Sequence, residues 1–83
     1  MLHESAYRFT AYFERVVLRK RPYLRREWCI WAIEHPLRVE MQDDDRWRFW
    51  AQIDEFHGKV IRVVTLNDRL AIHNAFPDRG FIP

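Results

Sequence analysis

The stretch Gly58-Lys-Val-Ile-Arg-Val-Val-Thr-Leu-Asn-Asp-Arg-Leu-Ala-Ile-His-Asn-Ala-Phe76 decides the fold, because it reads as two strands joined by a short turn. Lys59–Leu66 is rich in β-branched residues, which favour strands, and Leu70–Phe76 has the composition of a returning strand. Asn67 and Asp68 both tolerate the left-handed backbone that tight turns need. The sequence therefore predicts an antiparallel hairpin.

The length of the turn determines which residues of the two strands face each other. If the loop has two residues, Arg62 lies opposite His73. If Arg69 joins the loop, Arg62 faces Asn74 instead. In either register a fixed cation lies beside a titratable or amide side chain on an otherwise apolar hairpin. A charge in the middle of a strand needs either solvent on that face or a partner.

Length and composition favour a single folded domain over residues 1–83. Of the 83 residues, 48% are hydrophobic, including four Trp, six Phe and three Tyr, which is enough to supply a core. The single cysteine, Cys29, excludes an internal disulfide. Because it stands between Trp28 and Ile30, we interpret it as a small buried hydrophobe.

The sequence predicts a cytoplasmic protein that does not enter a membrane. No apolar run approaches the roughly 18 residues of a membrane-spanning helix, and no apolar signal segment follows Met1. The histidines are too scattered along the chain for a zinc site. The run Asp43–Asp45 is read as a turn, because the remaining spacing of a calcium loop is missing. We therefore expect neither a metal nor another cofactor.

The cations are nearly all arginines, and the formal net charge is +2. Arginine binds phosphate in a bidentate manner and stacks on bases, whereas lysine acts as a point charge. An arginine-rich surface with many aromatic residues fits a nucleic acid, and it fits an acidic protein equally well.

The N-terminal half predicts a short strand and two helices. Tyr7–Phe9 alternates apolar and polar residues, as strands do, and Thr10 is placed to cap a helix over Ala11–Lys20. A second helix is predicted from residue 23 or 24 to about His35, where Pro36 ends it. Its apolar stripe is expected to comprise Leu24, Trp28, Trp31 and Ala32.

After Pro36 apolar residues recur at every second position instead of every 3.6 residues, which indicates strands. Leu37–Met41 is the first of these, and Arg46–Ile53 follows the aspartate turn. Asp54–Gly58 is then a hairpin loop. On Arg46–Ile53 the expected core face comprises Trp47, Phe49, Ala51 and Ile53, and the opposite face comprises Arg46, Arg48, Trp50 and Gln52.

The predicted order is β-α-α-β-β-β-β, an α+β fold with two consecutive helices on a mostly antiparallel sheet of four to five strands. The face away from the helices then carries Arg48, Trp50, Arg62 and either His73 or Asn74. Such a face suits RNA, whose bases stack on aromatic rings and whose phosphates pair with cations. The alternative is that Trp50 packs against arginine stems.

Five segments carry a family resemblance that spans roughly residue 9 to the end: Tyr12-Phe-Glu-Arg15, His35-Pro36, Arg48-Phe-Trp50, Ile61-Arg-Val-Val64 and His73-Asn-Ala-Phe-Pro-Asp-Arg79. The layout resembles the small toxins of the RelE/ParE superfamily, and more closely BrnT and a related family of uncharacterised domains. Relatives often carry a histidine at the start of the first helix, where this chain has Tyr12.

The resemblance implies a metal-independent endoribonuclease, of a kind that often acts on translated messenger RNA and is silenced by a partner antitoxin. Cleavage through the 2′-hydroxyl needs a base, an acid and cations for the phosphorane charge. His73 can serve as base or acid near neutral pH, and Arg62 and Arg79 can hold the phosphate. The alternatives are that His73 is only a satisfied strand histidine and that Arg79 is only an ion-pair partner of Asp78 or of the chain end.

Substrate contacts are expected from Arg48, Trp50, Lys59, Asn74 and Asp78. Within this set Lys59 adds charge and Asp78 orients Arg79. Two other functions stay open. One is a non-catalytic module of the same fold that binds nucleic acid or protein. The other is an interaction or inhibitor protein that uses an exposed aromatic face around Trp50.

Overall fold

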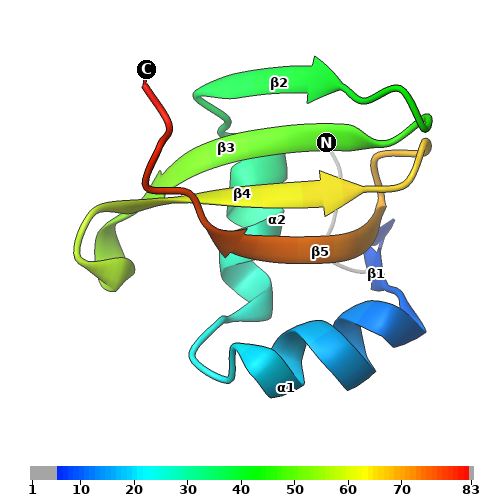
Figure 1. Ribbon diagram of the computed structural model, residues 1–83, viewed down its shortest axis with the longest axis horizontal. Coiled ribbons are helices and arrows are strands. Elements are labelled where there is room, and N and C mark those ends of the chain that lie inside the picture. The colour runs from blue at the N-terminus through cyan, green and yellow to red at the C-terminus, as the bar shows by residue number, and fades with distance from the viewer. Residues whose placement is uncertain (1–5, 83) are drawn as a thin grey trace.

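The computed structural model describes residues 6–82 and confirms the α+β class, with five strands in the order β1-β5-β4-β3-β2 (Figure 1). The strands β2 to β5 form an antiparallel meander, and β1 pairs in parallel with β5 at one edge. The strands are β1 (Arg8–Phe9), β2 (Arg38–Met41), β3 (Trp47–Ile53), β4 (Lys59–Thr65) and β5 (Ala71–Pro77).

The first helix occupies residues 11–20, as predicted, and Thr10 caps it. The Thr10 hydroxyl accepts the Phe13 N–H at 3.1 Å, which satisfies one of the free donors of the first turn. The middle of the helix is a π-helical turn, η2 (Phe13–Val17), in which the N–H of Leu18 bonds the carbonyl of Phe13. The segment α1 (Leu18–Lys20) completes the helix.

The second helix, α2 (Arg26–Glu34), begins two to three residues later than predicted. Leu24 donates its N–H to the Arg21 carbonyl in a turn, and Arg25 has extended backbone at the N-cap, so neither residue is helical. His35 follows the last turn and donates its N–H to the Trp31 carbonyl, as expected of a C-terminal residue.

The predicted apolar stripe of α2 is wrong at Trp31, which is 49% exposed. The buried face is made instead by Trp28, Cys29 and Ala32. This confirms Cys29 as a buried hydrophobe, and burial raises the pKa of its thiol to about 12. The indole of Trp31 lies on the imidazole of His35, with ring centroids 3.8 Å apart.

The helices cover one face of the sheet and one edge (Figure 1). The helix α2 lies behind β3 and β4, and the first helix runs along β5. Side chains from all these elements meet in one core, whose fully buried members include Phe13, Val17, Cys29, Ile61, Val63 and Ile72. The other sheet face, turned toward the viewer in Figure 1, carries neither α1 nor α2.

Both predicted registers of the last hairpin are wrong, because Arg62 lies opposite Phe76. The loop is longer than expected: Arg69 has a φ of 62°, and Leu66 donates its N–H to the Ala71 carbonyl, which closes a four-residue loop. A register shift beside Thr65 then inserts one further residue of β5 into the ladder.

The two other turns between strands are confirmed. The aspartate run is a turn, in which Asp45 has a φ of 63°, and the loop 54–58 contains the short helix η3 (Asp54–Phe56). Within residues 6–82, no helix is both long and apolar enough to span a membrane.

Candidate nucleic-acid interface

The face of the sheet opposite α2, called the outer face below, is built from two rows of paired residues. The register places one row in line across β2, β3, β4 and β5: Glu40, Arg48, Val64 and Asn74. The second row, one pleat away, is Arg38, Trp50, Arg62 and Phe76. Because side chains alternate along strands, both rows project from the same face. Guanidinium groups and aromatic rings therefore gather on the outer face, as predicted.

A depression of about 400 Å³ opens beside these rows, between the first helix and the sheet. It brings together the predicted catalytic pair, Arg62 and His73, and the predicted substrate contact Asn74. Its full lining is Tyr12, Gln42, Arg46, Arg62, Val64, His73, Asn74 and Phe76. Two arginines, one imidazole and two amides thus surround a space large enough for a phosphodiester group.

His73 is the residue that the register shift inserts into β5, since Ile72 pairs with Thr65 and Asn74 pairs with Val64. Bulges of this kind re-aim a side chain, and here the imidazole reaches the start of the first helix. Its Nδ1 lies 3.0 Å from the hydroxyl oxygen of Thr10. The ring of Tyr12 stacks on the imidazole, with centroids 4.8 Å apart and planes 24° apart.

The environment of His73 keeps its imidazole neutral at physiological pH. Burial lowers the pKa of the ring below 6.5, and the nearby positive charge of Arg46 lowers it further. The Thr10 hydroxyl, which accepts the Phe13 N–H, retains a second lone pair and its own proton. It can therefore accept from a protonated Nδ1 or donate to a bare one. A neutral ring with Nδ1 protonated leaves Nε2 free to take a proton.

Arg62 is held by its neighbours and is only 27% exposed at its side chain. Its Nη2 lies 3.2 Å from Oδ2 of Asp78, and its guanidinium lies over the ring of Phe76 at 4.7 Å. Within residues 6–82, the Nε of Arg62 is buried and has no hydrogen-bond partner. The charge in the middle of β4 is thus accommodated by one carboxylate and an aromatic ring.

Trp50 packs within the outer face and does not offer an open ring for bases. It is 5% exposed, stacks on Phe81 with centroids 5.5 Å apart, and donates its indole N–H to Asp78 at 2.9 Å. The guanidiniums of Arg48 and Arg62 both lie 5.6 Å from its ring centroid. The structure therefore favours the alternative in which Trp50 packs against arginine stems.

Asp78 binds Arg62 and Trp50. The expected pairing of Asp78 with Arg79 is not formed between these two described residues. The Trp50 N–H and the Arg62 charge hold the pKa of its carboxyl below the usual 3.8. Arg79 lies with Lys59 at a different depression, lined also by Val60, Pro77, Asp78 and Phe81. The structure thus assembles Arg62 with His73 but places the third predicted catalytic residue, Arg79, elsewhere.

Of the remaining predicted substrate contacts, Asn74 and Lys59 lie at the two depressions described above, and Arg48 lines neither of them. Arg48 is on the outer face, where its Nη2 lies 3.3 Å from the carboxylate of Glu40. Lys59 lies over the ring of Phe56 at 4.9 Å, beside the second depression. Asn74 lines the depression that contains His73.

Three polar residues of this depression escaped the sequence prediction of the site: Tyr12, Gln42 and Arg46. Tyr12 did carry a signal, because it occupies the helix position at which the resemblance leads one to expect a histidine. Gln42 and Arg46 flank the turn between β2 and β3, and only the three-dimensional arrangement brings them near β5.

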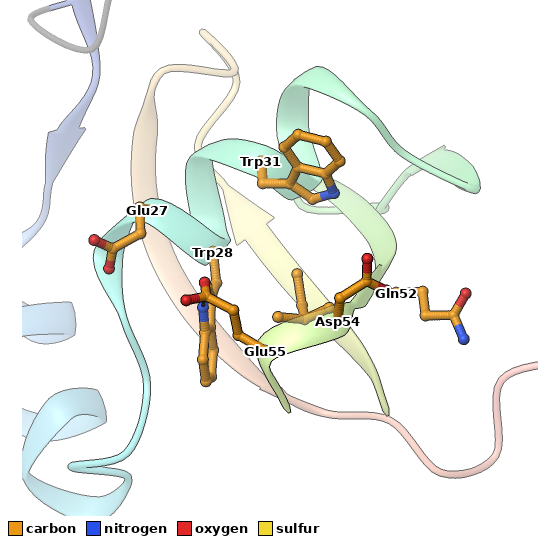
Figure 2. A pocket seen from close by; sticks show the side chains of 7 residues that line it. Glu27, Trp28, Trp31, Gln52, Asp54 and Glu55 are labelled. Carbon is orange, nitrogen blue, oxygen red and sulfur yellow. Dashed lines mark hydrogen bonds between the residues drawn. The ribbon is translucent and has the colours of Figure 1, made fainter. Parts of the chain in front are cut away.

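A separate pocket, distinct from both depressions and of about 230 Å³, lies on the opposite side of the sheet between α2 and the β3–η3 turn. Figure 2 shows the carboxylates of Glu27, Asp54 and Glu55 around it, with Trp31 above. The Nε1 of Trp28 donates to Glu55 at 3.0 Å. These negative charges repel phosphate, so this pocket is not a nucleic-acid site.

Within residues 6–82, no three or more His, Cys, Asp or Glu side chains are grouped so that they could hold a metal ion. No protein-family model, curated protein or solved structure matches the chain.

Proposed function

We propose that this protein binds RNA in the depression between the first helix and the outer face and cleaves it without a metal ion. The observation that carries the proposal is the meeting of Arg62, Arg46 and a neutral His73 in one solvent-open space. Guanidinium groups supply bidentate phosphate contacts, and an imidazole with a lowered pKa is a base at neutral pH.

Each residue has a distinct role in the proposed reaction. His73 removes the proton of the 2′-hydroxyl through Nε2, while Thr10 holds the ring at Nδ1. Arg46 and Arg62 stabilise the negative charge of the phosphorane. The exposed Tyr12, stacked on His73, is the candidate acid for the leaving 5′-oxygen or a platform for the neighbouring base.

The biological setting that we propose is that of a cytoplasmic toxin related to the RelE/ParE superfamily and to BrnT, held inactive by an antitoxin protein. This rests on the sequence resemblance of the segments around Tyr12, Arg48, Arg62 and His73. Inducible expression should stop growth and fragment cellular RNA. Co-expression of a short neighbouring reading frame should restore growth.

The direct test uses purified protein and a 5′-labelled RNA in the presence of EDTA. The wild type should cleave the RNA and leave a 2′,3′-cyclic phosphate, while a DNA of the same sequence stays intact because it lacks the nucleophile. His73→Ala should reduce cleavage at least 100-fold, in line with the loss of a general base. Wild-type and variant circular dichroism spectra should coincide.

A non-catalytic RNA-binding module is the second candidate, and the pairing of Arg62 with Asp78 favours it. A guanidinium that is already neutralised at 3.2 Å supplies less charge to a phosphorane. For this function, the same RNA should bind with a steep salt dependence and remain intact over hours.

A further inference from the structure

The strand β2 forms an open edge of the sheet. Within the described chain it pairs with β3 alone, and all four of its residues are exposed. Three large apolar side chains on or next to it are strongly exposed: Leu37 at 53%, Val39 at 38% and Met41 at 51%. Exposed apolar edges are templates for another strand, and natural proteins usually protect them.

The backbone groups that β2 offers can be assigned from its register with β3. Gln42 donates its N–H to the Arg46 carbonyl, so these two residues form a hydrogen-bonded pair. Such pairs alternate along an antiparallel ladder. Glu40 and Arg38 therefore turn their N–H and C=O groups toward β3, whereas those of Val39 and Met41 point to the open edge.

We propose that β2 pairs antiparallel with β2 of a second copy of this chain, with Val39 opposite Val39 on the two-fold axis. Val39 has outward backbone groups, so the two copies exchange both hydrogen bonds at the centre. This register sets Arg38 against Glu40 of the other copy, so opposite charges meet on both sides of the central valines. Leu37 precedes the strand and bonds its N–H to the Trp50 carbonyl, so the new ladder is limited to β2 itself.

The side chains of β2 on both faces of the sheet suit a second copy of the chain as the partner strand. Val39 and Met41 project toward the α2 side, since they pair with Phe49 and Trp47 of β3. Arg38 and Glu40 project from the outer face, where Glu40 already lies 3.3 Å from Arg48. In the dimer each Glu40 carboxylate, which already faces Arg48, also faces Arg38 of the other copy. One Nη of Arg38 donates to the Ile82 carbonyl of its own chain, and the guanidinium keeps further N–H donors for Glu40.

The self-complementary pattern is what selects a second copy over an unrelated strand. A strand of another protein would have to bring the same succession of a basic, an apolar and an acidic residue, as in Arg38, Val39 and Glu40. The opposite edge, β1, has only two residues and offers a much shorter ladder. Because the two-fold axis is perpendicular to the sheet, the outer faces of both copies point in the same direction.

Sedimentation equilibrium of the purified chain from about 1 to 200 μM tests the dimer. The wild type should approach twice the chain mass of 10.3 kDa at high concentration. Val39→Lys places two ammonium groups on the axis and should return the mass to that of one chain. Tyr23→Lys is the matched control: its side chain is 45% exposed and stacks on Phe56 of η3, which is not part of the proposed interface, so the dimer should persist.

Cysteine crosslinking tests the register and stays informative if charge variants alter solubility. Val39→Cys should form a disulfide-linked dimer under mild oxidation, since hydrogen-bonded pairs bring Cα atoms to about 5.5 Å. Met41→Cys should crosslink at least tenfold more slowly, because the two copies of position 41 are four residues apart. The native Cys29 is fully buried and does not contribute.

A wild-type chain that stays monomeric at 200 μM, or equal crosslinking at positions 39 and 41, overturns the proposal. An intact dimer in Val39→Lys overturns it as well, because that outcome moves the interface away from β2. Binding of another protein to a chain that remains monomeric assigns the edge to that partner and likewise rejects the second copy.

Discussion

The Nδ1 atom of His73 lies 3.0 Å from the Thr10 hydroxyl, and the same hydroxyl oxygen caps the first helix by accepting the Phe13 N–H. One side chain therefore fixes both the start of a helix and the orientation of the imidazole in the proposed site. The bulge in β5 makes this contact possible, because it gives His73 a place outside the regular ladder.

Replacing Thr10 by alanine should weaken both functions of this contact. The lost cap should lower the free energy of unfolding by about 1 kcal/mol, measured by urea denaturation. RNA cleavage should also fall, because the ring loses the partner that holds it. Thr10→Ser retains the hydroxyl and is the matched control. A variant Thr10→Ala with full stability and full activity would contradict both roles.

The pH dependence of cleavage should report the neutral form of His73. Since the folded pKa lies below 6.5, the base is present at neutral pH, and kcat/KM should fall as the pH drops through that lowered pKa. The ¹³C or ¹⁵N shifts of the labelled imidazole give the pKa independently. The midpoint of the kcat/KM profile should agree with the midpoint of the NMR titration of the His73 ring. A cleavage midpoint above 6.5 would point to another group.

The lowered pKa of His73 should also make the stability of the folded protein depend on pH. As the pH falls below 6.5, the unfolded chain binds a proton at His73 before the folded chain does, so the folded state loses stability. The contribution is complete above 6.5 and disappears as the pH passes down through the folded pKa. Comparing His73→Asn with the wild type by thermal unfolding between pH 4.5 and 7.5 isolates this contribution. The same pH dependence of thermal unfolding in the wild type and in His73→Asn would contradict this contribution.

Asp78 should matter for stability through the two groups that it satisfies. Asp78→Ala leaves the Trp50 indole N–H and the Arg62 guanidinium without their shared acceptor, at a cost of about 1–3 kcal/mol. Asp78→Asn retains an acceptor oxygen for Trp50 and should cost less. Urea denaturation followed by tryptophan fluorescence measures both. Equal losses would show that only the charge matters.

Salt dependence should separate the two depressions of the surface. Arg46→Ala should reduce the slope of log K against log salt for RNA binding by somewhat less than 1, as expected when one phosphate contact is lost. Arg79→Ala should leave the slope unchanged, because Arg79 lies at the depression beside Lys59. The opposite result would place the RNA along the C-terminal segment.

Local chemistry was sufficient to predict most of the elements. The alternation of apolar residues predicted the strands around Val39 and Phe49, β-branched composition predicted the strand around Val63, and Thr10 and Pro36 marked helix boundaries. The register of the last hairpin was not predictable in this way. It depends on the left-handed backbone of Arg69, an unusual conformation for that residue, and on the bulge at His73.

The site was predicted only in part. The sequence predicted Arg62 opposite either His73 or Asn74, and both registers are wrong; the bulge in β5 is what brings His73 to the depression that Arg62 lines. The contacts of Asp78 with Trp50 and Arg62 join segments 28 and 16 residues apart, and no local pattern encodes them. Trp31 is exposed because the buried face of α2 is rotated toward Cys29.

The most direct measurement of the central claim is an NMR titration of the labelled protein with a short RNA whose 2′-hydroxyls are methylated, so that it binds without being cleaved. The largest shift changes should fall on the His73 ring, the Arg62 and Arg46 guanidiniums and the Tyr12 ring. Changes confined to the surface around Lys59 and Arg79, or no changes at all at low salt, would contradict the assignment of RNA binding to this depression.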